Sequence, residues 1–179
     1  FYKLNRRESF RIDIPENIEC IEPNYYLTLL EFPYDEPPDD TYYNEQWYIE
    51  MIGVPAIWKR CMSGAGAKVA LIDSGLVAGH EDIDYAYVLR GHNFTNVGDT
   101  ADTSDQIGHG SVISGILAAQ INNSMGICGI VDKVELMPLK CFAPGRNATI
   151  DMVISAITMA REQGCDVINM SFGMLSYSG

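Results

Sequence analysis

A short apolar run that ends in an acid constrains the fold of this chain more than any other stretch. After Lys68, residues 69–72 read Val-Ala-Leu-Ile and lead directly into Asp73, Ser74 and Gly75. An unbroken apolar run of this length is typical of a strand buried on both faces of a parallel sheet. Because an unpaired buried charge is costly, we expect Asp73 at the carboxyl end of the strand, where open α/β sheets place their functional groups. An acid at such a point also suits a simple helix cap or turn.

The remaining pattern alternates between strands and helices. Two further strands are predicted at residues 134–139, in spite of Pro138, and at residues 165–170, whereas residues 91–107 are rich in loop-forming residues. A helix is predicted after His109 and another between a Thr149 cap and Gly164. The order strand, helix, strand, helix, strand predicts an α/β fold with a parallel sheet flanked by helices.

Apolar spacing predicts the buried face of each helix. A first helix between Gln46 and Trp58, broken or restarted at Pro55, carries Trp47, Ile49 and Ile52. In the helix after His109 the expected buried residues are Val112, Ile113, Ile116 and Leu117. In the helix that follows Thr149 they are Ile150, Val153, Ile154 and Ile157.

Charge and composition exclude several classes of partner. The net charge is -12, which disfavours binding to nucleic acid or to an anionic membrane surface. No apolar run reaches the roughly 18 residues that a membrane span needs. The five cysteines include no Cys-x-x-Cys pair, and we interpret them as free structural thiols rather than as disulfides, zinc ligands or a catalytic cysteine. Residues 31–41 mix acids with prolines and predict an exposed linker at a domain boundary.

Asp73 and His109 together predict acid–base chemistry. Both are expected at the carboxyl edge of the sheet, where a carboxylate that accepts the imidazole Nδ1–H leaves Nε2 free as a general base. Taken alone, a histidine at a helix start is often only a cap or a satisfied polar group. A metal site is the other possibility, but the chain has no His-x3-His type of spacing to support it.

Three blocks of the sequence resemble the subtilisin-like serine proteases, or subtilases. Residues 69–75 (Val-Ala-Leu-Ile-Asp-Ser-Gly) are similar to the aspartate box of that family, and residues 108–115 (Gly-His-Gly-Ser-Val-Ile-Ser-Gly) to its histidine box. Residues 166–173 (Asp-Val-Ile-Asn-Met-Ser-Phe-Gly) resemble its substrate-binding strand. The order of acid before histidine agrees with the subtilisin order. One departure is Val112, which stands where many members have a second histidine.

The resemblance implies a three-layer α/β/α fold and a serine endopeptidase acting on polypeptides. In that family Asp73 would orient the base, His109 would be the base, and Ser171, Phe172 and Gly173 would pair with the substrate backbone. The nucleophilic serine and the oxyanion asparagine would lie outside this chain, in a C-terminal half of the protease from the same gene or a second chain. We therefore expect this chain alone to be incomplete and inactive. The alternative is a non-catalytic binding or regulatory relative, or an inactive fragment.

The resemblance also implies a domain division and a metal. Residues 1–38 resemble the tail of an inhibitory propeptide with its linker, and residues 39–179 the N-terminal part of the catalytic domain. A structural Ca²⁺ is expected on Asp82, the Asn123 side chain and the carbonyls of Ile121, Met125 and Ile127, with Asp39 or Asp40 as a further ligand. The alternative is that Asn122-Asn123 is only a turn. The family is mostly secreted, which favours secretion or the cell surface, whereas free cysteines suit the cytoplasm.

Overall fold

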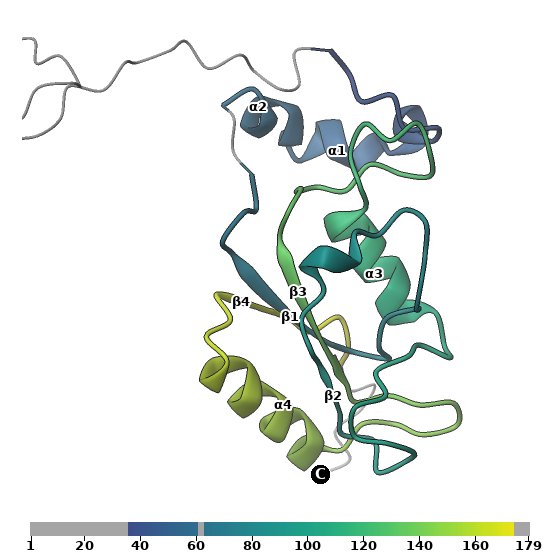
Figure 1. Cartoon of the computed structure of the whole chain (residues 1–179), viewed down its shortest axis with the longest axis vertical. Coiled ribbons are helices and arrows are strands. Elements are labelled where there is room, and N and C mark those ends of the chain that lie inside the picture. Colours follow the sequence, from purple (N-terminus) through teal and green to yellow (C-terminus); the bar gives the residue numbers. More distant parts are fainter. Residues whose placement is uncertain (1–35, 61–62, 174–179) are drawn as a thin grey trace, which may run out of the picture. The chain divides into compact units, whose positions relative to one another are not determined.

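A parallel sheet is the centre of the structure, a computed structural model that describes residues 36–60 and 63–173. Its strands lie in the order β2-β3-β1-β4 (Figure 1). Their bounds are β1 (Lys68–Asp73), β2 (His92–Asn93), β3 (Glu135–Lys140) and β4 (Val167–Asn169). β1 pairs with β3 from Lys68↔Glu135 to Asp73↔Lys140, and its other edge pairs with β4. The predicted α/β fold with a parallel sheet is confirmed.

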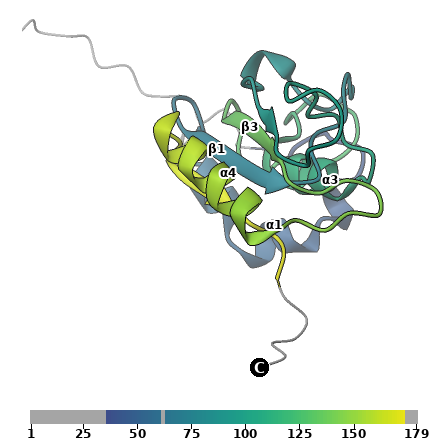
Figure 2. The same ribbon diagram turned by 90° about the horizontal axis from the view of Figure 1, so that it is seen from below.

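Two helices cover opposite faces of this sheet. They are α3 (His109–Ala118) and α4 (Ile150–Glu162). Side chains alternate across a strand, so β1 directs Val69 and Leu71 to one face and Ala70 and Ile72 to the other. The first pair belongs to a cluster packed on α3 and the second to a cluster that includes α4. Figure 1 shows α3 and α4 on the two sides of the strands, which gives the expected three layers, and Figure 2 shows α4 running alongside β1.

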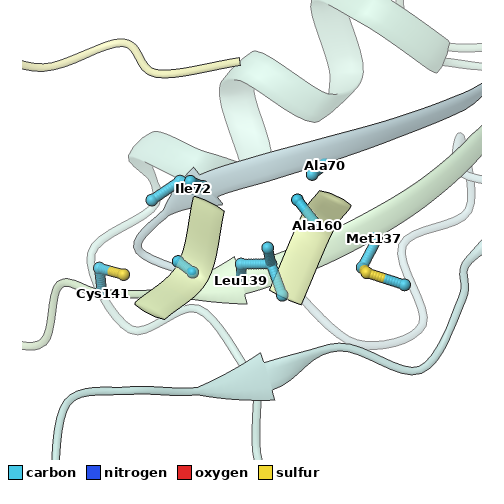
Figure 3. Close-up of a cluster of buried hydrophobic side chains, with 7 residues drawn as sticks. Ala70, Ile72, Met137, Leu139, Cys141 and Ala160 are labelled. Carbon is cyan, nitrogen blue, oxygen red and sulfur yellow. The ribbon is translucent and has the colours of Figure 1, made fainter. Parts of the chain in front are cut away.

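The face under α4 has the larger buried core (Figure 3). Ile72, Met137 and Leu139 from β1 and β3 meet Ala156 and Ala160 of α4. All five side chains are at most 4% exposed. Small helical side chains allow the helix backbone to approach the strands closely, which fixes the depth of this layer.

The N-terminal helices pack on a segment that follows α3. These helices are α1 (Trp47–Met51) and α2 (Val54–Trp58), preceded by a short 3-10 turn at Tyr43–Glu45. A second 3-10 turn, at Tyr85–Tyr87, lies between β1 and β2. The buried Gln46 amide binds both the N–H and the C=O of Cys128. The Trp58 indole N–H donates to the carbonyl of Ile130. Pro55 lies in the first turn of α2, so the predicted restart at that proline is confirmed.

The predicted helix faces are partly wrong. Ile150 and Ile154 of α4 are 70% and 57% exposed, while Ala156 and Ala160 are fully buried. In α3 the side chain of Val112 is 61% exposed. The same error affects the first helix, where Trp47 and Ile52 are exposed and only Ile49 is buried. The apolar pattern identifies the most hydrophobic side chains. The helix face that packs on the sheet instead carries side chains small enough for close approach, such as alanine.

One strand prediction needs correction, and the predicted strand that contains Pro138 is confirmed. Residues 91–107 were predicted as loop, yet they contain β2, a strand of two residues that is too short to give any pattern. Pro138 lies within β3, which has a neighbour on each side. On the β2 side the paired residues are only His92↔Leu139 and Asn93↔Lys140. The proline therefore lies before the stretch where β2 pairs with β3.

The described cysteines have the predicted character. Cys128 and Cys141 are buried, Cys165 is partly buried, and all three are free thiols. Burial raises the pKa of both Cys128 and Cys141 to about 12, so their reactive thiolate forms are suppressed at neutral pH.

The structure covers only part of the residues on which two further predictions rest, the domain boundary and the lack of a membrane-spanning segment. Of the segment predicted as residues 1–38, only residues 36–38 are described, so the rest of that prediction lies outside the described residues. Within residues 36–60 and 63–173, no helix combines the length and the apolar character that crossing a bilayer requires.

Candidate active site

Asp73 and His109 lie in direct contact at the carboxyl edge of the sheet. Asp73 is the last residue of β1 and His109 the first residue of α3. The imidazole Nδ1 lies 2.8 Å from Asp73 Oδ1 and 2.9 Å from Oδ2. Asp73 is 4% exposed at its side chain and His109 is 51% exposed. A carboxylate accepts hydrogen bonds, so this contact fixes the proton on Nδ1 and leaves Nε2 with a free lone pair.

The backbone around Asp73 holds the carboxylate in place. The N–H of Ser74 donates to Asp73 Oδ1 at 2.7 Å, and the carbonyl of Asp73 accepts from Cys141 N at 2.8 Å. Parallel pairing with β3 continues up to Asp73 itself. The acid is therefore anchored on the rigid centre of the sheet, which is the kind of element that positions a site accurately.

Gly110 lets the histidine helix lie against the end of β1. The N–H of Gly110 donates to Ser74 Oγ at 2.9 Å. A Cβ at this position would lie 2.2 Å from the carbonyl oxygen of Gly75 and 3.2 Å from Asp73 Cβ. Only glycine fits between the two backbones, so this residue sets the spacing between Asp73 and His109.

Asp105 caps the turn that presents His109. Its Oδ1 accepts from the N–H groups of Ile107 and Gly108, and its Oδ2 accepts from the N–H and the hydroxyl of Ser111. Burial by itself would raise the pKa of Asp105. These four hydrogen bonds outweigh burial and lower the pKa to about 2. The Asp105 carboxylate is therefore ionised throughout the pH range in which a histidine side chain titrates.

Lys140 supports the loop that contains Asp105. It is the last residue of β3, is 3% exposed and lies in register with Asp73. Its Nζ donates to the carbonyl of Ser104 and to the Gln106 side-chain oxygen. A buried ammonium group needs such partners, and here they are the residues on either side of Asp105.

The predicted substrate-binding residues follow β4 at the same edge of the sheet. Ser171, Phe172 and Gly173 are exposed and lie outside regular secondary structure. The Phe172 ring packs on Phe142 with centroids 5.2 Å apart. The N–H of Phe142 in turn donates to the carbonyl of Asp73. The structure therefore brings this segment to the edge that carries Asp73.

The predicted calcium residues gather around one loop. Asp82 is 4% exposed, and its carboxylate accepts from Asn123 Nδ2 at 2.9 Å and from Ile127 N at 3.0 Å. Asp40, also 4% exposed, accepts from Asn122 N through Oδ2. The predicted carbonyl ligands belong to this same loop and are those of Ile121, Met125 and Ile127. In the described part of the chain no three His, Cys, Asp or Glu side chains form a metal cluster, but calcium takes carbonyl and amide oxygens as well.

Sequence patterns missed the residues that support the pair. Asp105, Lys140 and the Ser74 hydroxyl had no predicted role, and Ser111 was only one letter of the histidine box. One local signal existed, because an aspartate shortly before a helix start is a common capping pattern. The role of Lys140 had no local signal, since its partners lie more than thirty residues earlier in the chain.

Comparison with known proteins finds one matching family and several similar relatives. A sequence profile of the subtilase family matches residues 64–178, which is more than half of the chain. The intracellular serine protease of Paenibacillus polymyxa is 36% identical over 127 residues, covering 70% of this chain and 38% of the relative. Thermitase of Thermoactinomyces vulgaris is 33% identical over 137 residues, covering 76% of this chain and 48% of the relative.

A third relative extends the match towards the N-terminus. The thermophilic serine proteinase of Bacillus sp. (strain AK1) is 31% identical over 157 residues, covering 87% of this chain and 37% of the relative. The chain thus spans between about a third and a half of the length of these curated relatives. The profile match, together with the acid, histidine and parallel sheet that it covers, shows that the chain belongs to the subtilase family.

Proposed function

We propose that the complete protein is a serine endopeptidase that hydrolyses peptide bonds with an Asp-His-Ser triad. Asp73 orients the base and His109 is the base, while the nucleophilic serine and an oxyanion asparagine come from outside this chain. The observation that carries the proposal is the contact of His109 Nδ1 with both carboxylate oxygens of Asp73. The contact favours the catalytic alternative because a general base needs its imidazole held in one tautomer.

The proposed reaction moves one proton through His109. Nε2 takes the proton of the serine hydroxyl as the oxygen attacks the peptide carbonyl, and the resulting imidazolium is stabilised by Asp73. The same proton then passes from Nε2 to the leaving amine, which breaks the peptide bond and leaves an acyl-enzyme. Water repeats the cycle and regenerates the serine. Burial of Asp73 supports this role because a charge pair is stronger away from solvent.

Residues 171–173 are proposed to bind the substrate backbone. The segment follows β4 in the chain and is exposed, so an extended peptide could add to it as a further strand. Ring packing between Phe142 and Phe172 supports the proposal because it ties this segment to the neighbour of Asp73.

A fluorophosphonate probe tests the proposed activity. Such probes react with an activated serine, so the full-length protein is expected to be labelled. His109→Ala is expected to abolish labelling because the serine loses its base. His92→Ala, which changes a histidine of β2, is the matched control and should label normally. Absence of labelling in the folded wild-type protein, or labelling that survives His109→Ala, would favour the non-catalytic alternative.

The loop of Asp82 is proposed to hold a structural Ca²⁺. The described residues fit the ion because Asp40 Oδ1 is buried without a hydrogen-bond partner among them. Asp40 binds Asn122, and Asp82 binds Asn123 of the same loop. The proposed ligands are Asp82, Asn123, Asp40 and the carbonyls of Ile121, Met125 and Ile127. A bound Ca²⁺ would neutralise two buried carboxylates and stiffen the loop.

Removal of calcium is expected to lower the melting temperature of the full-length protein. A ligand at 100 times its Kd stabilises by about 2.7 kcal/mol, and Asp82→Asn should remove most of that response. The control is Asp99→Asn, an exposed acid outside the loop, which should keep the full response to calcium. If the wild-type protein melts at the same temperature in calcium and in chelator, the calcium proposal fails.

A substitution of Asp40 is expected to change the melting temperature in opposite directions without and with calcium. Burial raises the pKa of Asp40 above the unfolded value, in spite of N–H donors from Asn122 and Asn123. The ionised carboxylate therefore costs stability as the pH rises above about 4. Without metal at pH 7, Asp40→Asn is expected to raise the melting temperature, whereas with calcium it should lower it.

The remaining half of the protease is proposed to cover the open side of the fold. Among the described residues, β4 has a neighbour only on its β1 side, and Val167 of β4 is 54% exposed. Ile150 and Ile154 of α4 are also exposed. An unpaired edge beside apolar side chains suits further strands and helices of the same domain. Residues 1–38 remain the proposed propeptide tail and linker, with residues 39–179 as the N-terminal part of the catalytic domain.

A further inference from the structure

We infer that Asp105 and Ser111 are positioning residues that hold His109 against Asp73. Neither side chain is hydrogen-bonded to the imidazole, so they act through the backbone that carries it. The inference rests on the proposed role of His109 as the base, but its geometric part concerns only the contact between His109 and Asp73.

The Asp105 carboxylate fixes the backbone on both sides of His109. Ile107 and Gly108 donate to Oδ1, each at 2.9 Å. Ser111 donates to Oδ2 through its N–H at 2.9 Å and its hydroxyl at 2.6 Å. All four donors lie within two residues of His109 along the chain. One carboxylate thus determines where the first turn of α3 starts and which way its first side chain leaves the helix.

The Ser111 hydroxyl links this turn to the loop that follows Asp73. A hydroxyl has one proton to donate, and here it goes to Asp105 while the oxygen accepts from Val77 N at 2.9 Å. Val77 lies four residues after Asp73. With the bond from Gly110 to Ser74 Oγ, this makes two side-chain links between the acid loop and the histidine helix.

The loop of Asp105 is itself fastened to the sheet. Lys140, in register with Asp73, donates to the residues before and after Asp105. The N–H of Asp105 donates to the carbonyl of Leu76, and Leu76 N donates to the carbonyl of Thr103. Asp105 therefore transmits the position of the sheet to His109 and is not merely a cap on a free helix end.

Loss of this link is expected to impair catalysis more than folding. A displacement of about 1 Å at a reacting group can cost about 10²-fold in rate. We expect Ser111→Ala to lower kcat of the full-length protein by about 10- to 100-fold with KM changed less than about twofold. Asp105→Asn should have at least that effect, because an amide has one acceptor oxygen and would turn an NH₂ towards the other donors.

The decisive measurement is the NMR signal of the His109 Nδ1–H proton in ¹⁵N-histidine-labelled full-length protein. This signal needs no turnover, so it tests the positioning even if the protein proves not to be a peptidase. Wild type is expected to show a protected downfield proton that is lost in Asp73→Ala. Ser111→Ala and Asp105→Asn should broaden it and speed its exchange with water at least tenfold.

Two matched variants separate positioning from general damage. Ser111→Thr keeps the hydroxyl and is expected to restore the signal and kcat. Asp102→Asn changes an exposed acid of the same loop and should leave both unchanged. The inference is overturned if Ser111→Ala keeps a protected proton and full kcat, or if Ser111→Thr is as impaired as Ser111→Ala. Should Asp105→Asn fail to fold, the two Ser111 variants still decide the matter.

Discussion

Asp73→Asn is expected to lower kcat of the full-length protein by about 10⁴-fold, which is the cost of the same change in other triad proteases. The variant should fold, because the amide has nearly the same shape as the carboxylate. Its NH₂ group, however, would face Nδ1, which must then accept a hydrogen bond. The ring proton moves to Nε2, and the nitrogen that faces the serine can no longer act as a base.

Peptide hydrolysis and the melting temperature together measure this effect. KM should stay near the wild-type value, because Asp73 is buried behind His109 and does not touch the substrate. Asp99→Asn serves as the matched control of charge and should retain full activity. A kcat within tenfold of wild type in Asp73→Asn would mean that the contact between His109 and Asp73 is not part of the mechanism.

Gly110→Ala is expected to destabilise the protein and to abolish activity. The new methyl group would lie 2.2 Å from the carbonyl oxygen of Gly75 and 3.2 Å from Asp73 Cβ. Neither atom belongs to a flexible side-chain end, so α3 must move away from β1. We expect a loss of unfolding free energy above about 3 kcal/mol, the upper end of ordinary overpacking.

The same helix contains a control for this prediction. A Cβ at Gly115 would be in ordinary contact with Ile127 at 3.6 Å. Gly115→Ala should therefore be neutral or stabilise the protein by up to about 1 kcal/mol, the usual gain from glycine to alanine within a helix. Denaturant unfolding of both variants measures the difference. Equal stability of the two would show that the close approach at Gly110 is not required.

Local patterns were sufficient to predict where Asp73 and His109 lie in the fold. The run of residues 68–75 identifies β1, and Asp73 lies at its end because a buried strand does not tolerate an unpaired charge. His109 stands where a glycine-rich turn gives way to a helical apolar pattern. Parallel topology then brings strand ends and helix starts to one edge. These rules predict that the two residues lie at the same edge of the sheet, but they do not predict the 2.8 Å contact between His109 Nδ1 and Asp73 Oδ1.

The supporting structure could not be predicted in the same way. Asp105 and Ser111 bond to residues that share no periodicity with them, and Lys140 acts on a loop far earlier in the chain. Helix faces were misjudged for a different reason. Ala156 and Ala160 are buried because the sheet lies close, whereas the larger Ile150 and Ile154 remain exposed. The spacing of hydrophobic residues shows which side chains favour burial. It does not show which face of the helix lies close to the sheet.

The pairing of β1 has a consequence for folding during synthesis on the ribosome. Both neighbours of β1, β3 and β4, follow it in the chain, and β3 begins only at Glu135. Pairing between strands that lie far apart in the sequence raises the contact order of a protein and slows its folding. Until β3 emerges, the apolar residues 69–72 lack both of the strands that flank them in the described sheet and are open to aggregation. We therefore expect the yield of folded protein to depend on how the nascent chain is protected during that interval.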